Sequence, residues 1–237
     1  MILPAEERRR GSRLAAATAV LFIAVGCTAA GLALLGTPPP PQPPASAAAA
    51  APAQKPVSVT PSPEPIPVPA NPQADPVVGP IMTASEPTQI NIPVIDVDSL
   101  LMQLGQNPDG TVQTPSLDEA SPAGWYTGSP TPGTIGPSVI LGHVDSRAQG
   151  RAVFYRLGDM RPGDEILVTR VDATVAKFVV DGVEKYPKDN FPQFSVYGNT
   201  DHAGLRLITC GGEFNETTRT YPDNVVVYAS LVSSHAA

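Results

Sequence analysis

A cysteine, a histidine and an arginine in this 237-residue chain could together perform covalent chemistry. Cys210 ends an alternating apolar and polar run, residues 205–209, and is followed by Gly211 and Gly212. Such alternation predicts a half-buried β-strand that stops at a turn, so the thiol lies at a strand end where a ligand can reach it. Free cysteine is also among the most buried residue types, so a small core residue is the competing interpretation.

His143 follows a short apolar run, residues 138–142, and precedes a polar turn. A thiol with a pKa near 8.5 is mostly protonated at pH 7, so a nucleophilic cysteine needs a base or a positive charge beside it. An imidazole can take the thiol proton and later protonate a leaving amine, and a guanidinium can stabilise a developing oxyanion. His202 and His235 lie in polar surroundings and are expected to be solvated.

Short apolar runs separated by turn residues continue from residue 81 to the C-terminus. We expect a strand pair within residues 89–97, with Pro93 at its turn, and a hairpin that turns at Asp172 and Ala173. Turns of helix are expected at residues 117–120 and 150–157. The pattern predicts a mainly β domain, a closed barrel or a sandwich. The predicted strands are residues 138–142, 165–171, 174–183, 205–209 and 224–231.

The N-terminal part has a different character. Residues 1–13 carry four arginines, and residues 14–35 contain no charge and are long enough to span a bilayer as a helix. The positive-inside rule then predicts a cytoplasmic N-terminus and an extracytoplasmic remainder. A cleaved signal peptide has a shorter apolar region, which favours a retained single-pass anchor. Processing as a lipoprotein at Cys27 is the alternative.

Residues 36–80 are rich in proline and alanine, and 16 of the 29 prolines fall within residues 38–80. Such a segment buries little apolar surface, which predicts a disordered linker between the anchor and a domain at 81–237. That domain holds 10 Lys and Arg against 18 Asp and Glu. It lacks the basic patch that nucleic-acid binding requires, which excludes that class of function.

Several motifs together resemble the sortase family, within it the class F enzymes of Gram-positive actinobacteria. The resemblance covers about residues 88–232. Its central motifs are Leu-Ile-Thr-Cys-Gly-Gly at 207–212, Asn-Val-Val-Val-Tyr-Ala at 224–229 and Gly-His-Val-Asp at 142–145. The supporting stretches are residues 123–126, 153–159, 161–164, 184–188 and 221–224.

The resemblance implies a sortase-type β-barrel and a cysteine transpeptidase. Cys210 would attack the Thr carbonyl of a Leu-Pro-any-Thr-Gly (LPXTG-like) sorting signal and form a thioacyl intermediate, with His143 as acid and then base. The implied partners are secreted proteins with such C-terminal signals and a peptidoglycan precursor or another amine acceptor. The implied location is the cell membrane, with the catalytic domain on the cell-wall side. No metal or cofactor is predicted, because one Cys and one His fall short of a zinc ligand set.

The family's arginine, which faces the cysteine from the last strand, has no direct counterpart here. Asn224 stands near that position. Arg219, nine residues after Cys210, is the predicted catalytic arginine. Arg206 shares a strand face with Cys210 because side chains repeat every two residues, but it is about 13 Å away along the strand. An ordinary surface charge is the competing interpretation for both arginines.

Three other readings stay open. Papain-like enzymes carry the cysteine before the histidine, which is the reverse of the order here. L,D-transpeptidases place the cysteine close behind the histidine, whereas Cys210 lies 67 residues beyond His143. A non-catalytic β-domain that binds cell-wall or surface ligands would leave Cys210 merely buried. Asp145 and Asp201 are expected to be turn residues rather than calcium ligands.

Overall fold

The computed structural model describes residues 38–48, 77–116, 122–146 and 150–237. Pro40–Ala237 form one compact unit, which therefore begins before the expected domain start at residue 81. Within it, Ala45–Ala47 (η1) form a short 3₁₀ turn, and Ala47 is fully buried. The predicted membrane span at residues 14–35 and the predicted turn at 117–120 lie outside the described residues. No helix among the described residues has the length and apolarity needed to cross a bilayer.

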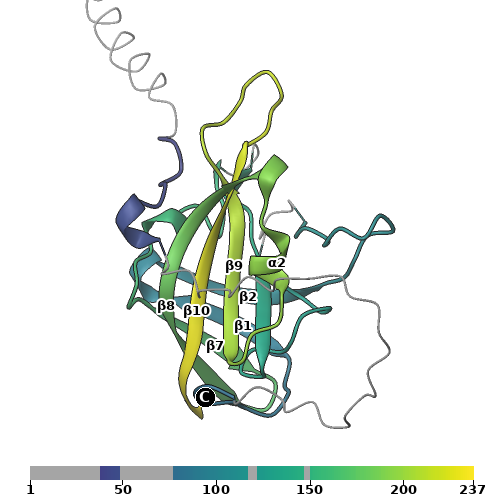
Figure 1. The fold of residues 1–237 in the computed structure, drawn as a ribbon, viewed down its shortest axis with the longest axis vertical. Coiled ribbons are helices and arrows are strands. Elements are labelled where there is room, and N and C mark those ends of the chain that lie inside the picture. Colours follow the sequence, from purple (N-terminus) through teal and green to yellow (C-terminus); the bar gives the residue numbers. More distant parts are fainter. Residues whose placement is uncertain (1–37, 49–76, 117–121, 147–149) are drawn as a thin grey trace, which may run out of the picture. The chain divides into compact units, whose positions relative to one another are not determined.

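The chain forms a closed eight-stranded β-barrel, with strand order β1-β2-β3-β4-β9-β10-β8-β7 (Figure 1). Pairing of β1 with β7 closes it. A separate two-stranded ribbon, β5 with β6, follows β4. The strands are β1 Pro87–Ile92, β2 Val97–Leu104, β3 Ala123–Tyr126, β4 Gly136–Leu141, β5 Asp145–Ser146, β6 Gly150–Arg151, β7 Glu165–Arg170, β8 Thr174–Pro187, β9 Ala203–Gly211 and β10 Asp223–Ala236.

Helical structure among the described residues is short. The α-helix α2 (Gln193–Tyr197) lies between β8 and β9. The 3₁₀ turns besides η1 are η2 Pro93–Ile95, η3 Leu157–Asp159 and η4 Lys188–Asn190.

Strand β9 lies between β4 and β10 and pairs with them in opposite senses. It is parallel to β4, with Leu141 opposite Ile208, and antiparallel to β10, with Asn224 opposite Cys210. β10 in turn pairs with β8 along nearly its whole length, from Pro187 opposite Asp223 to Thr174 opposite Ala236. Cys210 is therefore held by pairing with β10, two residues beyond the last pair between β9 and β4.

Apolar side chains fill the barrel interior, since strand alternation sends every second residue inward. On β9, Leu205 and Leu207 point to this core, whereas Ile208 joins a second apolar cluster with Val139, Val196 and Val226. The largest fully buried side chains include Phe154, Phe178, Ile90, Ile92, Leu104, Ile140, Leu157 and Met160. The strand predicted at residues 205–209 is thus confirmed, but the expectation that it is half-buried is wrong, because both of its faces are covered.

Most other expectations for the domain are also confirmed. The domain is mainly β and closed, β1 and β2 pair across the turn at Pro93–Ile95, and β7 and β8 form the hairpin predicted at Asp172 and Ala173. The predicted helical turn at residues 150–157 is wrong over most of its length. Gly150–Arg151 form a strand that pairs with β5, and 3₁₀ structure begins only at Leu157.

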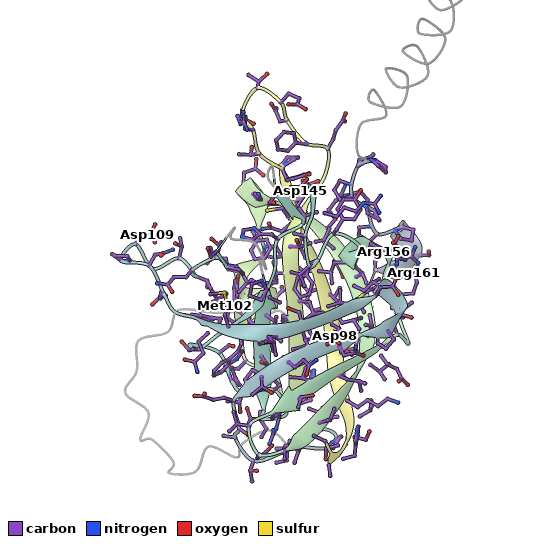
Figure 2. The ribbon with its side chains drawn as sticks, turned by 180° about the vertical axis from the view of Figure 1, so that it is seen from behind. Asp98, Met102, Asp109, Asp145, Arg156 and Arg161 are labelled. Atoms are coloured by element: carbon purple, nitrogen blue, oxygen red, sulfur yellow. The ribbon has the colours of Figure 1, made fainter. Side chains whose placement is uncertain are left out.

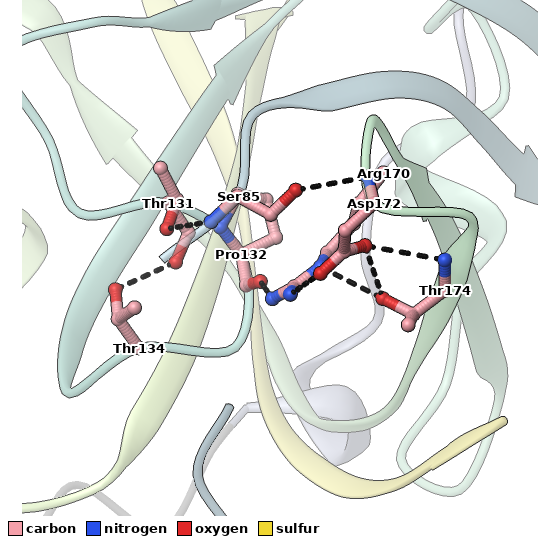
Figure 3. A network of polar contacts seen from close by, with 7 residues as sticks. All are labelled: Ser85, Thr131, Pro132, Thr134, Arg170, Asp172 and Thr174. Carbon is pink, nitrogen blue, oxygen red and sulfur yellow. Dashed lines mark hydrogen bonds and ion pairs between the residues drawn. The ribbon is translucent and has the colours of Figure 1, made fainter. Parts of the chain in front are cut away.

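A polar network around Arg170 lies at the turn from β7 to β8 (Figure 3). The Arg170 side chain donates to the Pro132 carbonyl at 2.8 Å and to Thr174 Oγ1 at 3.1 Å, and it pairs with Asp172 at 2.5 Å. Asp172 also accepts from Thr174 Oγ1 at 2.6 Å, and its backbone N–H donates to Ser85. The hydrogen bond from Arg170 is the main cause that holds the pKa of Asp172 far below its usual value.

Candidate functional site

Cys210 lies one residue before the end of β9 and is partly exposed. The turn after it depends on Gly212, which has a φ of +87° in the region that favours glycine. A Cβ at this position would lie 2.7 Å from Asp223 Oδ2 and 2.9 Å from the Pro222 ring. Glycine at 212 therefore lets the chain leave β9 close to β10, and the thiol stays at an open strand end.

His143 lies beside the same strand end because β4 runs parallel to β9. Leu141 pairs with Ile208, and the Gly142 backbone N–H donates to the Ile208 carbonyl at 3.1 Å. The chain continues to His143 on one side and to Cys210 on the other. Gly142 is needed here too, since a Cβ would lie 2.5 Å from the Phe154 ring. The two predicted site residues therefore end neighbouring strands.

One ring nitrogen of His143 has a defined role. Nε2 lies 2.7 Å from the Pro115 carbonyl oxygen. A carbonyl can only accept a hydrogen bond, so Nε2 carries the hydrogen in the neutral ring. Nδ1 is then the basic nitrogen, and this contact fixes the tautomer. The imidazole can thus accept a proton at Nδ1 and release it there.

Cys210 packs against a small apolar cluster formed by Val144, Tyr155 and Tyr221. The Tyr221 hydroxyl donates to Asp145 Oδ2, and this hydrogen bond joins the segment just before β10 to β5. Burial, followed by this hydrogen bond, raises the pKa of Tyr221 well above its usual value, so it stays a neutral donor. Asp145 lies at the barrel end from which the loop at 212–222 rises (Figure 2). Tyr221 was not predicted to be a neighbour of the thiol.

A lysine contacts the thiol directly. Lys188 Nζ, in η4 just after β8, lies 3.3 Å from Cys210 Sγ. Residues 184–188 entered the sequence analysis only as a supporting motif, without a role for the lysine. Only a prediction that β8 pairs with β10 along nearly its whole length would have placed residue 188 beside residue 222.

The predicted arginines occupy other positions. Arg219 is exposed in the loop at 212–222, where it has a φ of +56° and its backbone N–H donates to Asn215. Among the described residues, no hydrogen bond or ion pair joins its side chain to Cys210. The structure does not bring Arg219 to the thiol, and its catalytic role stays a prediction. Asn224 does stand directly opposite Cys210, as the sequence register predicted.

Arg206 is buried and committed elsewhere. Its guanidinium carbon lies 4.6 Å from the centre of the Tyr228 ring, and burial lowers its pKa. Nη1 donates to the Leu205 carbonyl at 3.1 Å, while Nε has no hydrogen-bond partner among the described residues. Arg206 thus stabilises the outer face of the β9–β10 pair at a distance from the thiol.

The N-terminal described segment also reaches this site. Gln42 Oε1 accepts a hydrogen bond of 2.9 Å from the Gly212 backbone N–H, two residues after the thiol. The Gln42 amide nitrogen donates to the Pro40 carbonyl, which orients the side chain. A backbone donor near Cys210 is therefore already occupied by the chain itself.

The chemistry available is that of a thiol in contact with an ammonium group, with an imidazole at the end of the neighbouring strand. Within residues 38–48, 77–116, 122–146 and 150–237, no group of three or more His, Cys, Asp or Glu side chains could hold a metal ion.

The chain matches one family model and is similar to several solved structures. The sortase domain family model matches residues 90–232. Similar solved structures include sortase A of Listeria monocytogenes, at 19% identity and a TM-score of 0.48, over 65% of this chain and 92% of that one. A lid mutant of sortase A from Corynebacterium diphtheriae has 23% identity and a TM-score of 0.47, over 63% and 73%. The SrtA sortase from Actinomyces oris has 22% identity and a TM-score of 0.48, over 69% and 89%. No match was found among curated proteins.

Proposed function

This chain belongs to the sortase family and is a cysteine transpeptidase, and from that premise we propose that Cys210 is its nucleophile and His143 its acid and base. The substrate is a secreted protein with a C-terminal sorting signal of the Leu-Pro-any-Thr-Gly type. The acceptor is an amine of a peptidoglycan precursor or of another surface molecule. The reaction joins the secreted protein covalently to the cell surface.

The reaction proceeds through two acyl transfers. The Cys210 thiolate attacks the Thr carbonyl carbon, a C–S bond forms, and the Thr–Gly C–N bond breaks. His143 gives its proton to the leaving Gly amine. The imidazole then takes a proton from the incoming amine, whose nitrogen attacks the thioester and releases Cys210. Dividing amide exchange in this way replaces one difficult step by two easier ones.

The parallel pairing of β4 with β9 is the observation that carries this proposal. It brings two residues that are 67 positions apart in the chain to adjacent strand ends. The contact of His143 Nε2 with the Pro115 carbonyl supports the acid–base role, because it leaves the lone pair of Nδ1 free to accept a proton.

The cellular setting is also part of the proposal. Residues 14–35 anchor the protein in the cell membrane, with the basic residues 1–13 in the cytoplasm and the catalytic domain on the cell-wall side. The motifs at 207–212 and 224–229 support a class F enzyme of a Gram-positive actinobacterium. These assignments rest on the sequence pattern.

The test uses the full chain, purified in a mild detergent, and a panel of Leu-Pro-Xaa-Thr-Gly peptides with and without an added amine. We expect an adduct on Cys210 that lacks the Gly-side fragment and that the amine converts into a new amide. Cys210→Ala should lose the adduct and at least about 10⁴-fold in turnover while it keeps the thermal midpoint of the wild type.

Three outcomes would contradict the proposal. Turnover retained in Cys210→Ala would remove the cysteine from the mechanism. A wild-type protein that reacts with no peptide, while an alkylating agent modifies Cys210 quickly, would overturn the proposed substrate. Slow alkylation with no adduct would favour a non-catalytic binding domain.

A further inference from the structure

Lys188 is the positively charged side chain in direct contact with the thiol, at 3.3 Å from Nζ to Sγ. We infer that Lys188 is a catalytic residue: its ammonium group stabilises the Cys210 thiolate and the oxyanion that forms when the thiolate attacks a carbonyl. This role rests on the proposed function of Cys210. It gives the lysine the position that an arginine was predicted to fill.

Two backbone contacts with the chain at the start of β10 hold Lys188 in place. Pro187 pairs with Asp223 at the end of the β8–β10 ladder, and the Lys188 backbone N–H donates to the Pro222 carbonyl at 2.9 Å. β10 lies between β8 and β9, so Lys188 reaches across the start of β10 to the thiol. Directly opposite Cys210, Asn224 offers only a short, uncharged side chain.

No carboxylate among the described residues competes for the Lys188 ammonium group. The Lys188 side chain contacts Cys210, whereas Lys185, three residues earlier on β8, pairs with Asp223 at 3.5 Å. The other nearby cation, Arg151, lies 4.6 Å from the centre of the Tyr155 ring. Lys188 is therefore the cation that remains available for a reacting sulfur.

The remaining titratable groups around the thiol are neutral or already bonded. Tyr155 and Tyr221 pack against Cys210, and Tyr221 donates to Asp145. His143 lies at the end of β4, with Nε2 on the Pro115 carbonyl. Neither tyrosine can supply the positive charge that Lys188 supplies. Because Lys188 provides that charge, the imidazole is free for proton transfer.

During the reaction Lys188 keeps its proton. The C–S bond forms from the sulfur lone pair, the carbonyl π electrons move to oxygen, and the ammonium group donates a hydrogen bond to that oxygen. When the C–N bond breaks, His143 supplies the proton to the leaving amine. Such donors act most strongly where charge develops in the transition state.

Two readouts on the full chain test this assignment. The first is the rate at which iodoacetamide modifies Cys210, which needs no knowledge of the substrate. Lys188→Met, which removes the charge at similar length, should lower this rate at pH 7 about fivefold, the effect of one exposed charge at about 4 Å in water. Added salt should slow the wild type toward the variant and leave Lys188→Met nearly unchanged.

The second readout is turnover of the peptide that the wild type accepts. We expect Lys188→Met to lose about 10- to 100-fold in kcat with little change in KM, because an exposed donor contributes less than the 10²–10³ of a buried one. Lys188→Arg should recover much of the loss. Lys185→Met is the matched control, and it should behave like the wild type in both readouts, with equal thermal midpoints throughout.

The assignment would be overturned by a Lys188→Met protein with wild-type alkylation and wild-type kcat. Recovery of an acyl group on the Lys188 amine, seen by peptide mapping, would also overturn it, because the lysine would then be an acceptor. If no peptide reacts with the wild type, the proposed substrate fails, and the alkylation arm still decides the role of Lys188.

Discussion

At one end of the barrel, where β7 turns into β8, Arg170 is only 2% exposed and every arm of its guanidinium has an acceptor. At the other end, where β9 stops, Cys210 is partly exposed and Lys188 has the thiol as its partner. The same two strands, β8 and β10, link both ends. Polar groups at the first end are paired with each other, which contributes to stability. Cys210 and Lys188, at the second end, remain available to contact a substrate.

The largest expected effect lies at the Cys210 end. His143→Gln keeps a polar side chain but cannot transfer a proton, so kcat should fall by about 10²- to 10⁴-fold. The thermal midpoint should change little, since the ring is only partly buried. Peptide turnover and thermal unfolding of the same preparation check both statements. A variant that unfolds early would mean that the imidazole serves the fold, and the contrast between the two ends would then disappear.

At the Arg170 end the expected effect is on stability. Arg170→Met leaves the buried Pro132 carbonyl without its donor and removes the partner of Asp172. The free energy of unfolding should fall by about 2 kcal/mol, the cost of an unpaired buried polar group. Urea unfolding measures it, and alkylation of Cys210 in the folded protein should not change. Arg170→Lys keeps the charge but loses the planar, forked donor group. Its free energy of unfolding should therefore lie between those of the wild type and Arg170→Met.

The smallest effect sharpens the same comparison through pH. The pKa of Asp172 is depressed in the folded protein, so its contribution to stability is present above the unfolded value of about 3.9 and is lost as pH falls below it. Asp172→Asn should therefore be less stable than the wild type at pH 7, and the difference should narrow toward pH 3. Urea midpoints at several pH values test this. A gap that stays constant with pH would show that the charge of Asp172 contributes nothing.

The regular strands were predictable because their apolar residues alternate, as in β7, β8 and β9. The strand Ala123–Tyr126 was not predicted, because three of its four residues are buried and no alternation marks it. The extension of β10 to Ala236 was missed as well: its last residues are exposed and polar, and pairing with β8 rather than burial holds them.

The site was predictable only where one chain segment contains the information. Cys210 at a strand end, His143 after an apolar strand and Asn224 opposite the thiol could be read from local pattern and register. Lys188 could not, because its contact with Cys210 depends on the order in which three strands pair. Arg219, the single arginine downstream of Cys210 in the sequence, is exposed in its loop, and no described contact joins it to the thiol.

The parallel pairing of β4 with β9 also has a consequence for folding. Parallel neighbours need a long crossover, and here 67 residues separate His143 from Cys210. Closing so long a segment costs chain entropy before any contact offsets it, so pairing of this kind forms slowly. Until the barrel closes, Cys210 is an ordinary thiol without its imidazole. The proposed acyl transfer therefore becomes possible only when the fold is complete.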